Sequence, residues 1–316
     1  MKIWPLVLVL LFPFAAAAQP SAERAVAITF DDLPFAAVPQ EDGAYLERMT
    51  TRLLRQLQAD QVPAVGFVNE AKLSREGQSD PARVALLRSW VRAGFELGNH
   101  TYSHPSLNHT PLDAFEADLL QGETVTRPLM QSAGRPLRWF RHPFLHQGNT
   151  VEVRAAFQDF LAAHGYRAAP VTVNNAEWVF ALAYSRALAQ GDEDTARRIS
   201  AAYVPYMEAV FARAEQLALD LFGRPIPHVM VLHANALNAD HFSSLAAMLR
   251  QRGYRFISLD DALRDTVYAS PLGFGGIEGE SWLECWARQA GLRPSKSPAV
   301  PGFVTQWAGS AANRGY

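Results

Sequence analysis

The sequence has little of several features that define common protein classes. It contains one cysteine, Cys285, which excludes an internal disulfide. Lysine is also scarce, with three in 316 residues, and no lysine-rich run occurs. Binding to a nucleic-acid backbone needs clustered positive charge and is therefore not expected. Charged residues make up 19% and hydrophobic residues 49%, and we find no internal repeat. These values exclude a charged disordered tail, a collagen-like chain and a coiled coil, and leave a packed globular protein.

The first eighteen residues form a segment of their own. Lys2 precedes an apolar run at 6–14, and three alanines follow at 16–18. The run is short for a membrane span and ends in the small residues that a signal peptidase accepts, which predicts a signal peptide over 1–18. A hydrophobic first helix is a weaker alternative, because the run lies at the extreme terminus. We therefore expect an exported protein, periplasmic or extracellular, with no stable membrane insertion after the leader is removed.

Short apolar segments alternate with segments of helical periodicity through most of the chain. Strands are expected at 25–30, 62–68, 95–98, 139–144, 166–173, 229–233 and 255–258. Helices are expected at 46–57, 81–91, 112–130, 151–163, 203–222 and 242–251. This alternation predicts an α/β fold, with a mostly parallel sheet or barrel and helices outside it.

Two stretches depart from the alternation. About fifty residues separate Trp178 from His228, more than one crossover helix needs, and Gly191 followed by acidic residues gives a stop and a restart. This predicts an inserted helical hairpin. Near the carboxyl terminus, 281–290 predicts one docking helix in a segment otherwise rich in glycine, proline and serine. We expect a single domain over 19–316, with a core at about 25–266 and a tail at 267–316.

Ionisable side chains follow four of the predicted strands. In α/β sheets and barrels, the loops after the carboxyl ends of the strands build the functional site. Residues of this kind on four strand ends are therefore expected to cluster. They are Asp31, Asp32, His100, His104, Arg141 and His233.

His100 and His104 have a spacing that suits metal ligands. Four-residue spacing would place both imidazoles on one side of a helical turn, as a cation such as zinc requires, and Pro105 disfavours continuing the helix. Asp31 or Asp32 can supply a carboxylate as the third ligand, and the other can take a proton from water. An isolated histidine pair is more simply explained as surface or capping residues, but the neighbouring aspartates favour a metal site.

Four segments, in this order, match a known family. They are Ile28-Thr29-Phe30-Asp31-Asp32, His100-Thr101-Tyr102-Ser103-His104, Arg141-His142-Pro143-Phe144 and Leu232-His233. They resemble successive motifs of the polysaccharide deacetylases of carbohydrate esterase family four, which have the NodB-homology fold. The resemblance covers about 26–261. It implies a distorted (β/α) barrel with a divalent metal, most often zinc, held by Asp32, His100 and His104.

The resemblance also implies catalytic roles. Asp31 would be the general base that activates water for attack on an acetyl carbonyl, and Arg141 would orient it. The backbone N–H of Phe144, together with the metal, would stabilise the oxyanion that forms. His233 would act as the general acid that protonates the departing amine.

The fourth motif of the family is matched less closely. The segment 174–178 resembles it, but Glu177 stands where an aspartate normally steadies the acid histidine. The resemblance implies that Glu177 is the partner of His233 and that Trp178 lines the acetyl pocket, although a tryptophan after a strand is more often plain core. His146, just past the third motif, is a candidate substrate contact, with solvent exposure as the simpler interpretation.

The sequence thus predicts a metal-dependent hydrolase that removes acetyl groups from an N-acetylated, or O-acetylated, carbohydrate. One alternative is an amidase for a non-carbohydrate amide, because metal, base and acid do not themselves recognise sugar. Another is a catalytically silent glycan-binding protein that kept the barrel. The presence of both a base and an acid argues against the silent protein. The acetylated substrate and the oligomeric state stay open.

Overall fold

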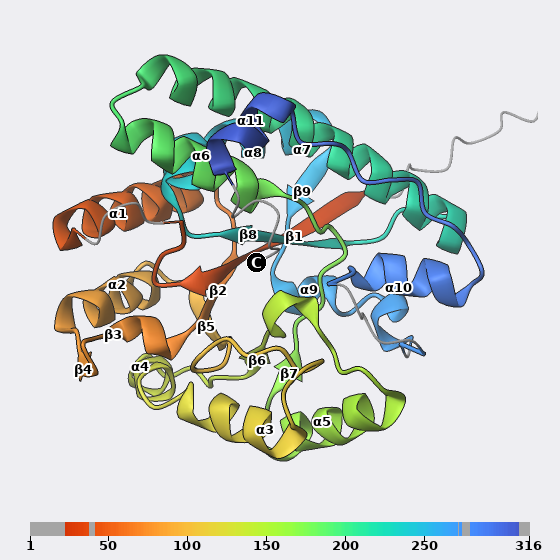
Figure 1. The fold of residues 1–316 in the computed structure, drawn as a ribbon. Coiled ribbons are helices and arrows are strands. Elements are labelled where there is room, and N and C mark those ends of the chain that lie inside the picture. Colours follow the sequence, from red (N-terminus) through yellow and green to blue (C-terminus); the bar gives the residue numbers. More distant parts are fainter. Residues whose placement is uncertain (1–22, 38–41, 271, 274–278, 310–316) are drawn as a thin grey trace, which may run out of the picture.

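The structure is a computed structural model that describes residues 23–37, 42–270, 272–273 and 279–309. The predicted signal peptide at 1–18 lies outside these residues. Figure 1 shows a curled sheet in the middle of the molecule with helices around it. The predicted α/β architecture is confirmed.

The central sheet is parallel throughout. Its strands follow the order β7-β6-β5-β2-β1-β8, and β9 pairs with the start of β1 beside β2. Their bounds are β1 Arg24–Leu33, β2 Ala64–Val68, β5 Glu96–Asn99, β6 Trp139–Phe140, β7 Arg167–Ala168, β8 His228–His233 and β9 Tyr254–Phe256. A small antiparallel ribbon, β3 Ser74–Arg75 with β4 Gln78–Ser79, lies outside this sheet.

The curled sheet closes on itself through the chain that follows β7. There, Val173 forms a parallel bridge with Met230 of β8, and the Thr172 N–H donates to the Val229 carbonyl at 2.9 Å. The strands β6 and β7 are shorter than the predicted 139–144 and 166–173. After β6, Pro143 opens a 3₁₀ turn, and so the chain leaves the sheet early. The result is a distorted barrel, as the sequence predicted.

Alternation along β1 separates two apolar layers. Val26, Ile28 and Phe30 pack against the outer helices, whereas Ala25 and Ala27 face the interior of the curled sheet with residues of β2, β6 and β8. Successive strand residues point to opposite faces, so this parity directs Thr29 and Asp31 to the interior as well. The strand therefore carries a carboxylate to the mouth of the barrel.

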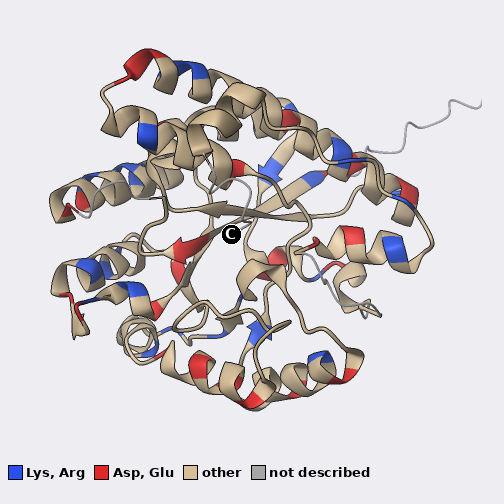
Figure 2. Ribbon diagram, in the orientation of Figure 1, with Lys and Arg blue, Asp and Glu red and all other residues tan. Residues whose placement is uncertain are grey.

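The outer layer consists of helices that mostly match the predicted ones. In order these are α1 Gly43–Ala59, α2 Pro81–Arg92, α3 Leu112–Gln121, α4 Thr126–Ser132, α5 Val151–Ala163, α6 Glu177–Ala189, α7 Glu193–Phe222, α8 Ala236–Gln251, α9 Leu259–Ala262, α10 Trp282–Gln289 and α11 Gly302–Ala308, with 3₁₀ turns η1 Glu70–Leu73, η2 Pro143–Leu145 and η3 Thr266–Ala269. Figure 2 shows charges of both signs spread over this layer.

The single helix predicted at 112–130 is wrong, because the chain breaks between α3 and α4. Gly122 lies against the loop after β5, where a Cβ atom would come within 2.5 Å of the Thr101 carbonyl carbon. The buried Glu70 carboxylate then accepts the N–H groups of Val125 and Thr126, at 3.0 and 2.7 Å, and so begins α4. The break lets the end of α3 lie against the loop that carries His100 and His104, where the Asp118 side chain accepts the Tyr102 N–H at 2.8 Å.

The inserted helical hairpin is confirmed and consists of α6 and α7. Gly191 adopts a left-handed φ of 70° between the two helices, and the Asp192 side chain caps α7 by accepting the Thr195 N–H at 2.9 Å. The second helix begins ten residues before the predicted 203–222. In Figure 1 the hairpin lies over the top of the sheet.

The carboxyl-terminal segment docks on the barrel and on the hairpin. The predicted helix at 281–290 is α10, which begins with a capping box between Ser281 and Glu284 and buries Trp286. The sequence did not predict α11, which packs on α6 and is tied to it by Arg186, a donor to the Trp307 carbonyl at 3.3 Å. Within the described ranges, none of the helices combines the length and apolar character needed to span a membrane.

Candidate active site

Two adjacent aspartates end the central strand. The register between β1 and β2 shifts between Phe30 and Leu33, and Asp32 has a left-handed φ of 66°. Regular strand geometry would send neighbouring side chains to opposite faces, but this irregularity turns both carboxylates toward one cleft. Both side chains are buried, and Asp31 lies in register with His233 of β8.

The histidine loop does not have the helical turn that the sequence predicted. His100 directly follows β5, and Thr101 and His104 adopt left-handed φ values of 67° and 62°. The Asn99 side chain accepts the Thr101 N–H at 2.7 Å, and the Thr101 hydroxyl accepts the His104 N–H at 3.0 Å. These local bonds compete with helix formation. The two rings nevertheless meet, with centroids 4.8 Å apart.

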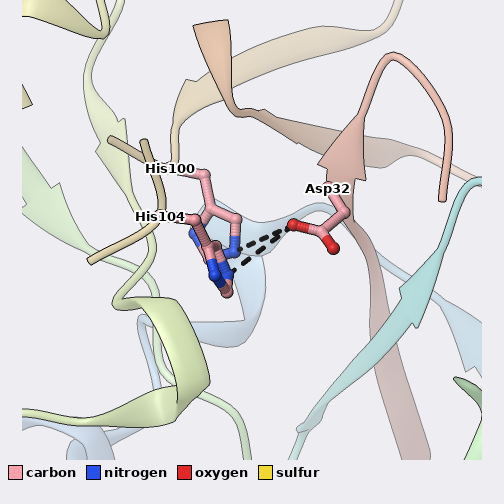
Figure 3. A group of neighbouring side chains, drawn as sticks. All are labelled: Asp32, His100 and His104. Carbon is pink, nitrogen blue, oxygen red and sulfur yellow. Dashed lines mark ion pairs between the residues drawn. The ribbon is translucent and has the colours of Figure 1, made fainter. Parts of the chain in front are cut away.

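Asp32, His100 and His104 lie close enough to share one cation (Figure 3). One potential ligand atom from each residue lies within 4.8 Å of the others, and Asp32 Oδ1 is 3.8 Å from His100 Nε2 and 3.7 Å from His104 Nε2. Asp32 Oδ1 is buried and has no hydrogen-bond partner among the described residues, which suits a metal-ligand oxygen. Two imidazoles and one carboxylate suit zinc, so these residues fit the metal that the family implies.

The histidines are held in the form that binds metals. Burial lowers the pKa of His100 well below its usual value, and the neighbouring His104 lowers it further. Burial also lowers the pKa of His104. The Nδ1 atom of His100 lies 2.8 Å from the Arg141 carbonyl, so a neutral ring donates there and leaves Nε2 as an electron-pair donor toward Asp32.

Lys72, from the 3₁₀ turn after β2, contacts the same carboxylate from the other side. Its Nζ lies 3.2 Å from Asp32 Oδ2, while Asp32 Oδ1 faces the histidines. Burial acts to raise the pKa of Asp32, but Lys72, and after it His104, outweigh that effect and hold this pKa far below its usual range. The sequence analysis missed this residue. The sequence signal that could have drawn attention to it is the rarity of lysine, because Lys72 and Lys296 are the only lysines beyond Lys2.

Arg141 lies behind Asp31. Its Nη1 is 3.5 Å from Asp31 Oδ2, its Nη2 donates to the Thr29 hydroxyl at 2.9 Å, and its guanidinium lies 4.7 Å from the centre of the Phe67 ring. Burial raises the pKa of Asp31, and the charge of Arg141 opposes that rise. The arginine is itself buried, and so the ion pair is fixed from three sides.

His233 and Glu177 form the second charged pair of the cleft. His233 Nδ1 lies 2.8 Å from Glu177 Oε2. The other oxygen, Oε1, accepts the side-chain amides of Asn235 and, at 2.8 Å, Asn238. Burial acts to lower the pKa of His233, but the hydrogen bond and charge of Glu177 outweigh it and raise this pKa. The predicted contact between Glu177 and His233 is therefore present, although glutamate replaces the usual aspartate.

These groups surround one cleft with a volume of about 490 Å³. Eight of the ten predicted site residues line it, whereas Arg141 and Glu177 lie behind Asp31 and His233. The eight are Asp31, Asp32, His100, His104, Phe144, His146, Trp178 and His233. Cleft volumes of this size are typical of small-molecule sites.

Comparison with protein families gives a match over the amino-terminal part of the chain. Residues 18–168 match a family model described as polysaccharide deacetylase. The matched segment covers just under half of the chain, and over it the chain resembles the polysaccharide deacetylase family. This part of the sequence contains the first three motifs, and the predicted resemblance is confirmed.

Solved structures with the same fold include several members of carbohydrate esterase family four. A chitin deacetylase from the fungal pathogen Colletotrichum lindemuthianum is 20% identical, with a TM-score of 0.51 over 80% of this chain and 91% of that one. A mutant of BA3943, described as a CE4 family pseudoenzyme, is 16% identical, with a TM-score of 0.50 over 77% of this chain and 68% of that one. At these identities the likeness shows the fold alone. The comparison with curated protein sequences found no match.

Two segments lie beyond the matched range, the fourth motif at 174–178 and the fifth at Leu232-His233, and there the structure adds what the sequence analysis missed. Asn235 and Asn238 follow the fifth motif, with Asn238 on α8, and point their amides at Glu177. Tyr203 of α7 donates its hydroxyl to Asn238 at 2.9 Å. The two asparagines thus hold the buried carboxylate directly, and Tyr203 holds Asn238.

Proposed function

We propose that this protein is an exported, metal-dependent hydrolase that removes acetyl groups from an N-acetylated carbohydrate. The family supports carbohydrate deacetylation. The observation that carries the finer proposal is the convergence of a possible metal site, a separate carboxylate and an acid-type histidine in one cleft. Export rests on the leader-like sequence at 1–18.

The metal would be held by Asp32, His100 and His104. When bound, such a metal supplies a Lewis acid, which polarises an acetyl carbonyl and eases deprotonation of water. The zinc-compatible ligand atoms and the buried, unpartnered Asp32 Oδ1 support this assignment. Three protein ligands leave room for water and substrate, as in other catalytic zinc sites.

Asp31 would be the general base. It lies beside the three proposed metal ligands but is not one of them, and Arg141 orients its carboxylate. In this mechanism Asp31 takes a proton from the attacking water as the new C–O bond forms. The raised pKa of this buried carboxyl supports the role, because a base works best when its pKa approaches the working pH.

His233 would be the general acid, and Glu177 would keep it protonated. Collapse of the tetrahedral intermediate breaks the C–N bond, and the leaving nitrogen takes its proton from His233. The backbone N–H of Phe144 would donate to the oxyanion, and Trp178 would bound the space for the acetyl methyl group. Both residues line the cleft with His233, which supports these assignments.

The two alternatives differ in what the cleft would do. An amidase for non-carbohydrate amides would use the same metal, base and acid, and only the substrate distinguishes it. A silent glycan-binding protein needs no acid pair. The buried, fully bonded Glu177 and its contact with His233 favour an enzyme, because such a pair is costly to bury and serves proton transfer.

The test measures bound metal and released acetate on the purified full chain. We expect about one divalent metal per chain, acetate release from an acetylated glycan, and loss of that activity on chelation with recovery on adding zinc. Asp31→Asn should keep the metal while turnover falls by about 10²–10⁴-fold, the usual contribution of general-base catalysis.

His100→Ala is the matched variant, and it should lose the metal. Full metal content in His100→Ala would overturn the ligand set, and unchanged turnover in Asp31→Asn would overturn the base. If glycan affinity survives chelation and no acetate is ever released, the protein is the silent binding module instead.

A further inference from the structure

One wall of the cleft is formed by two loops that are tied together. They are the loop after the histidine motif, which carries Ser106 and Asn108, and the loop after the third motif, which carries His146. Asn108 Oδ1 accepts the Gly148 N–H at 2.9 Å, and Ser106 Oγ lies 2.7 Å from His146 Nδ1. Ser106 and His146 both line the cleft. The wall is therefore held in shape before any ligand enters.

The hydrogen bonds of Ser106 decide where its proton goes. Its Oγ accepts the backbone N–H of Asn108 at 3.2 Å. Within the described part of the chain, the acceptor that lies within hydrogen-bond distance of the hydroxyl is His146 Nδ1. We assign the hydroxyl proton to this contact, so that Ser106 donates to Nδ1 and Nδ1 carries a lone pair rather than a proton.

This arrangement fixes the tautomer of His146. Burial lowers the pKa of His146, and the neighbouring His109 lowers it further, so the ring is neutral near pH 7. A neutral imidazole with a bare Nδ1 carries its proton on Nε2. That nitrogen, on the other side of the ring from Ser106, has no hydrogen-bond partner among the residues the structure describes. It is a neutral donor on the wall of the cleft.

The surrounding chemistry indicates what this donor would meet. Among the described residues that line the cleft, Asp31 and Asp32 are the ones with a formal charge at neutral pH apart from the histidines, and no lysine or arginine is present. The Phe144 ring, whose centroid lies 5.5 Å from that of His146, adds an apolar face beside the donor. A hydroxyl or amide oxygen on an uncharged sugar suits this combination, whereas the described lining offers the carboxylate of an anionic sugar no lysine or arginine.

We propose that His146, positioned by Ser106, is the donor of a subsite for an uncharged acetylated sugar of an oligosaccharide substrate. The inference rests on the proposed deacetylase function and deepens it. Ser106 is the positioning residue, since it acts through the imidazole. The subsite should favour an uncharged sugar over one that carries a carboxylate.

The tautomer is tested directly by nitrogen-15 NMR of the histidine rings in the zinc-loaded protein. We expect His146 to show an unprotonated Nδ1 and a protonated Nε2. In Ser106→Ala this preference should weaken, and Ser106→Thr, which keeps the hydroxyl, should restore it. A protonated Nδ1 in the parent protein, or an unchanged spectrum in Ser106→Ala, would overturn the inference, and neither result would affect the proposed reaction.

Binding is tested with the tetramer of N-acetylglucosamine on zinc-loaded Asp31→Asn, in which turnover does not interfere. Adding His146→Phe should weaken the tetramer's affinity by about threefold to tenfold, the range for one neutral hydrogen bond. His164→Phe is the matched control, because His164 is exposed at the end of α5, and it should not change the affinity. A tetramer that carries a carboxylate on alternate sugars should bind more weakly than the neutral one.

The outcomes separate the two proposals. If the parent enzyme releases acetate from the tetramer but His146→Phe leaves affinity unchanged, the subsite is wrong and the deacetylase stands. If the parent releases no acetate from any acetylated glycan, the proposed function is wrong. If the carboxylated tetramer binds as tightly as the neutral one, the neutral substrate class is wrong. A failure of the neutral tetramer to bind Asp31→Asn would overturn the subsite.

Discussion

The two sides of the cleft are built in different ways. On the side of the proposed metal site, here called the metal side, Asp32 lies near the end of β1, and His100 and His104 lie in the short loop after β5, which local hydrogen bonds shape. On the acid side, His233 depends on a glutamate from α6 that lies 56 positions away in sequence. That glutamate is in turn held by amides at the start of α8.

The metal side depends mainly on local sequence, whereas the acid side depends on tertiary packing. A metal site needs a few ligand atoms at fixed spacing, and loops next to buried strands can supply them with little support from the rest of the chain. A buried carboxylate needs all of its acceptor positions filled, because an unpaired charge in the interior is costly. The acid side therefore required the inserted hairpin and α8 as well as the barrel.

Glu177→Gln tests the acid side and has the largest expected effect of the three variants considered below. Glutamine removes the charge that raises the pKa of His233. As the proposed general acid, His233 must be protonated to act, so activity should fall as the pH rises through this pKa. In Glu177→Gln the falling limb of the pH–rate profile should move to lower pH, and turnover at pH 7 should drop by about 10²-fold.

The control for Glu177→Gln is Glu215→Gln, which removes a carboxylate from α7 that pairs with Arg252 at 2.8 Å away from the cleft. It should leave the pH–rate profile in place. Metal content should be unchanged in both variants. If the falling limb of the pH–rate profile stays at its original pH in Glu177→Gln, the carboxylate does not set the protonation of His233. The acid side would then depend on distant residues no more than the metal side does.

The sequence predicted the barrel because strand and helix periodicities are local and β1 is apolar on both faces. It predicted Asp32, His100 and His104 as a cluster because strand ends converge. It failed on the shape of the histidine loop, since left-handed residues such as Thr101 and His104 carry no sequence signal comparable to glycine. It missed Asn238 because a polar residue on a helix is usually a solvent contact, and only tertiary packing buries it.

Lys72→Met tests the metal side with a smaller effect. In metal-free protein, Lys72 is the nearest cation to the buried Asp32 carboxylate, and removing it should destabilise that form by about 1–2 kcal/mol. This figure is well below the cost of breaking a fully buried pair, because the Lys72 side chain is 35% exposed and its charge is screened. A bound divalent metal replaces the lost charge, so the metal-loaded form should lose less.

By thermodynamic linkage, Lys72→Met should therefore bind zinc more tightly than the parent, by up to about tenfold. Thermal unfolding with and without metal, together with zinc titration, checks both halves of this expectation. Lys72→Arg should resemble the parent, and Lys296→Met, at an exposed lysine, should change neither quantity. Weaker zinc binding in Lys72→Met would show that the lysine orients the carboxylate rather than competing with the metal.

Tyr203→Phe probes how far the acid side depends on the hairpin, and it has the smallest expected effect on turnover. Losing the hydroxyl leaves the buried Asn238 Oδ1 without its donor, which should cost about 1–3 kcal/mol of stability. The Asn238 amide still donates to the His233 carbonyl at 2.9 Å and to Glu177, so turnover should change less than about threefold. Tyr184→Phe, whose hydroxyl bonds Asp240 away from the cleft, is the control. If the falling limb of the pH–rate profile moves in Tyr203→Phe, then α7 influences the pKa of His233 and does more than cover it.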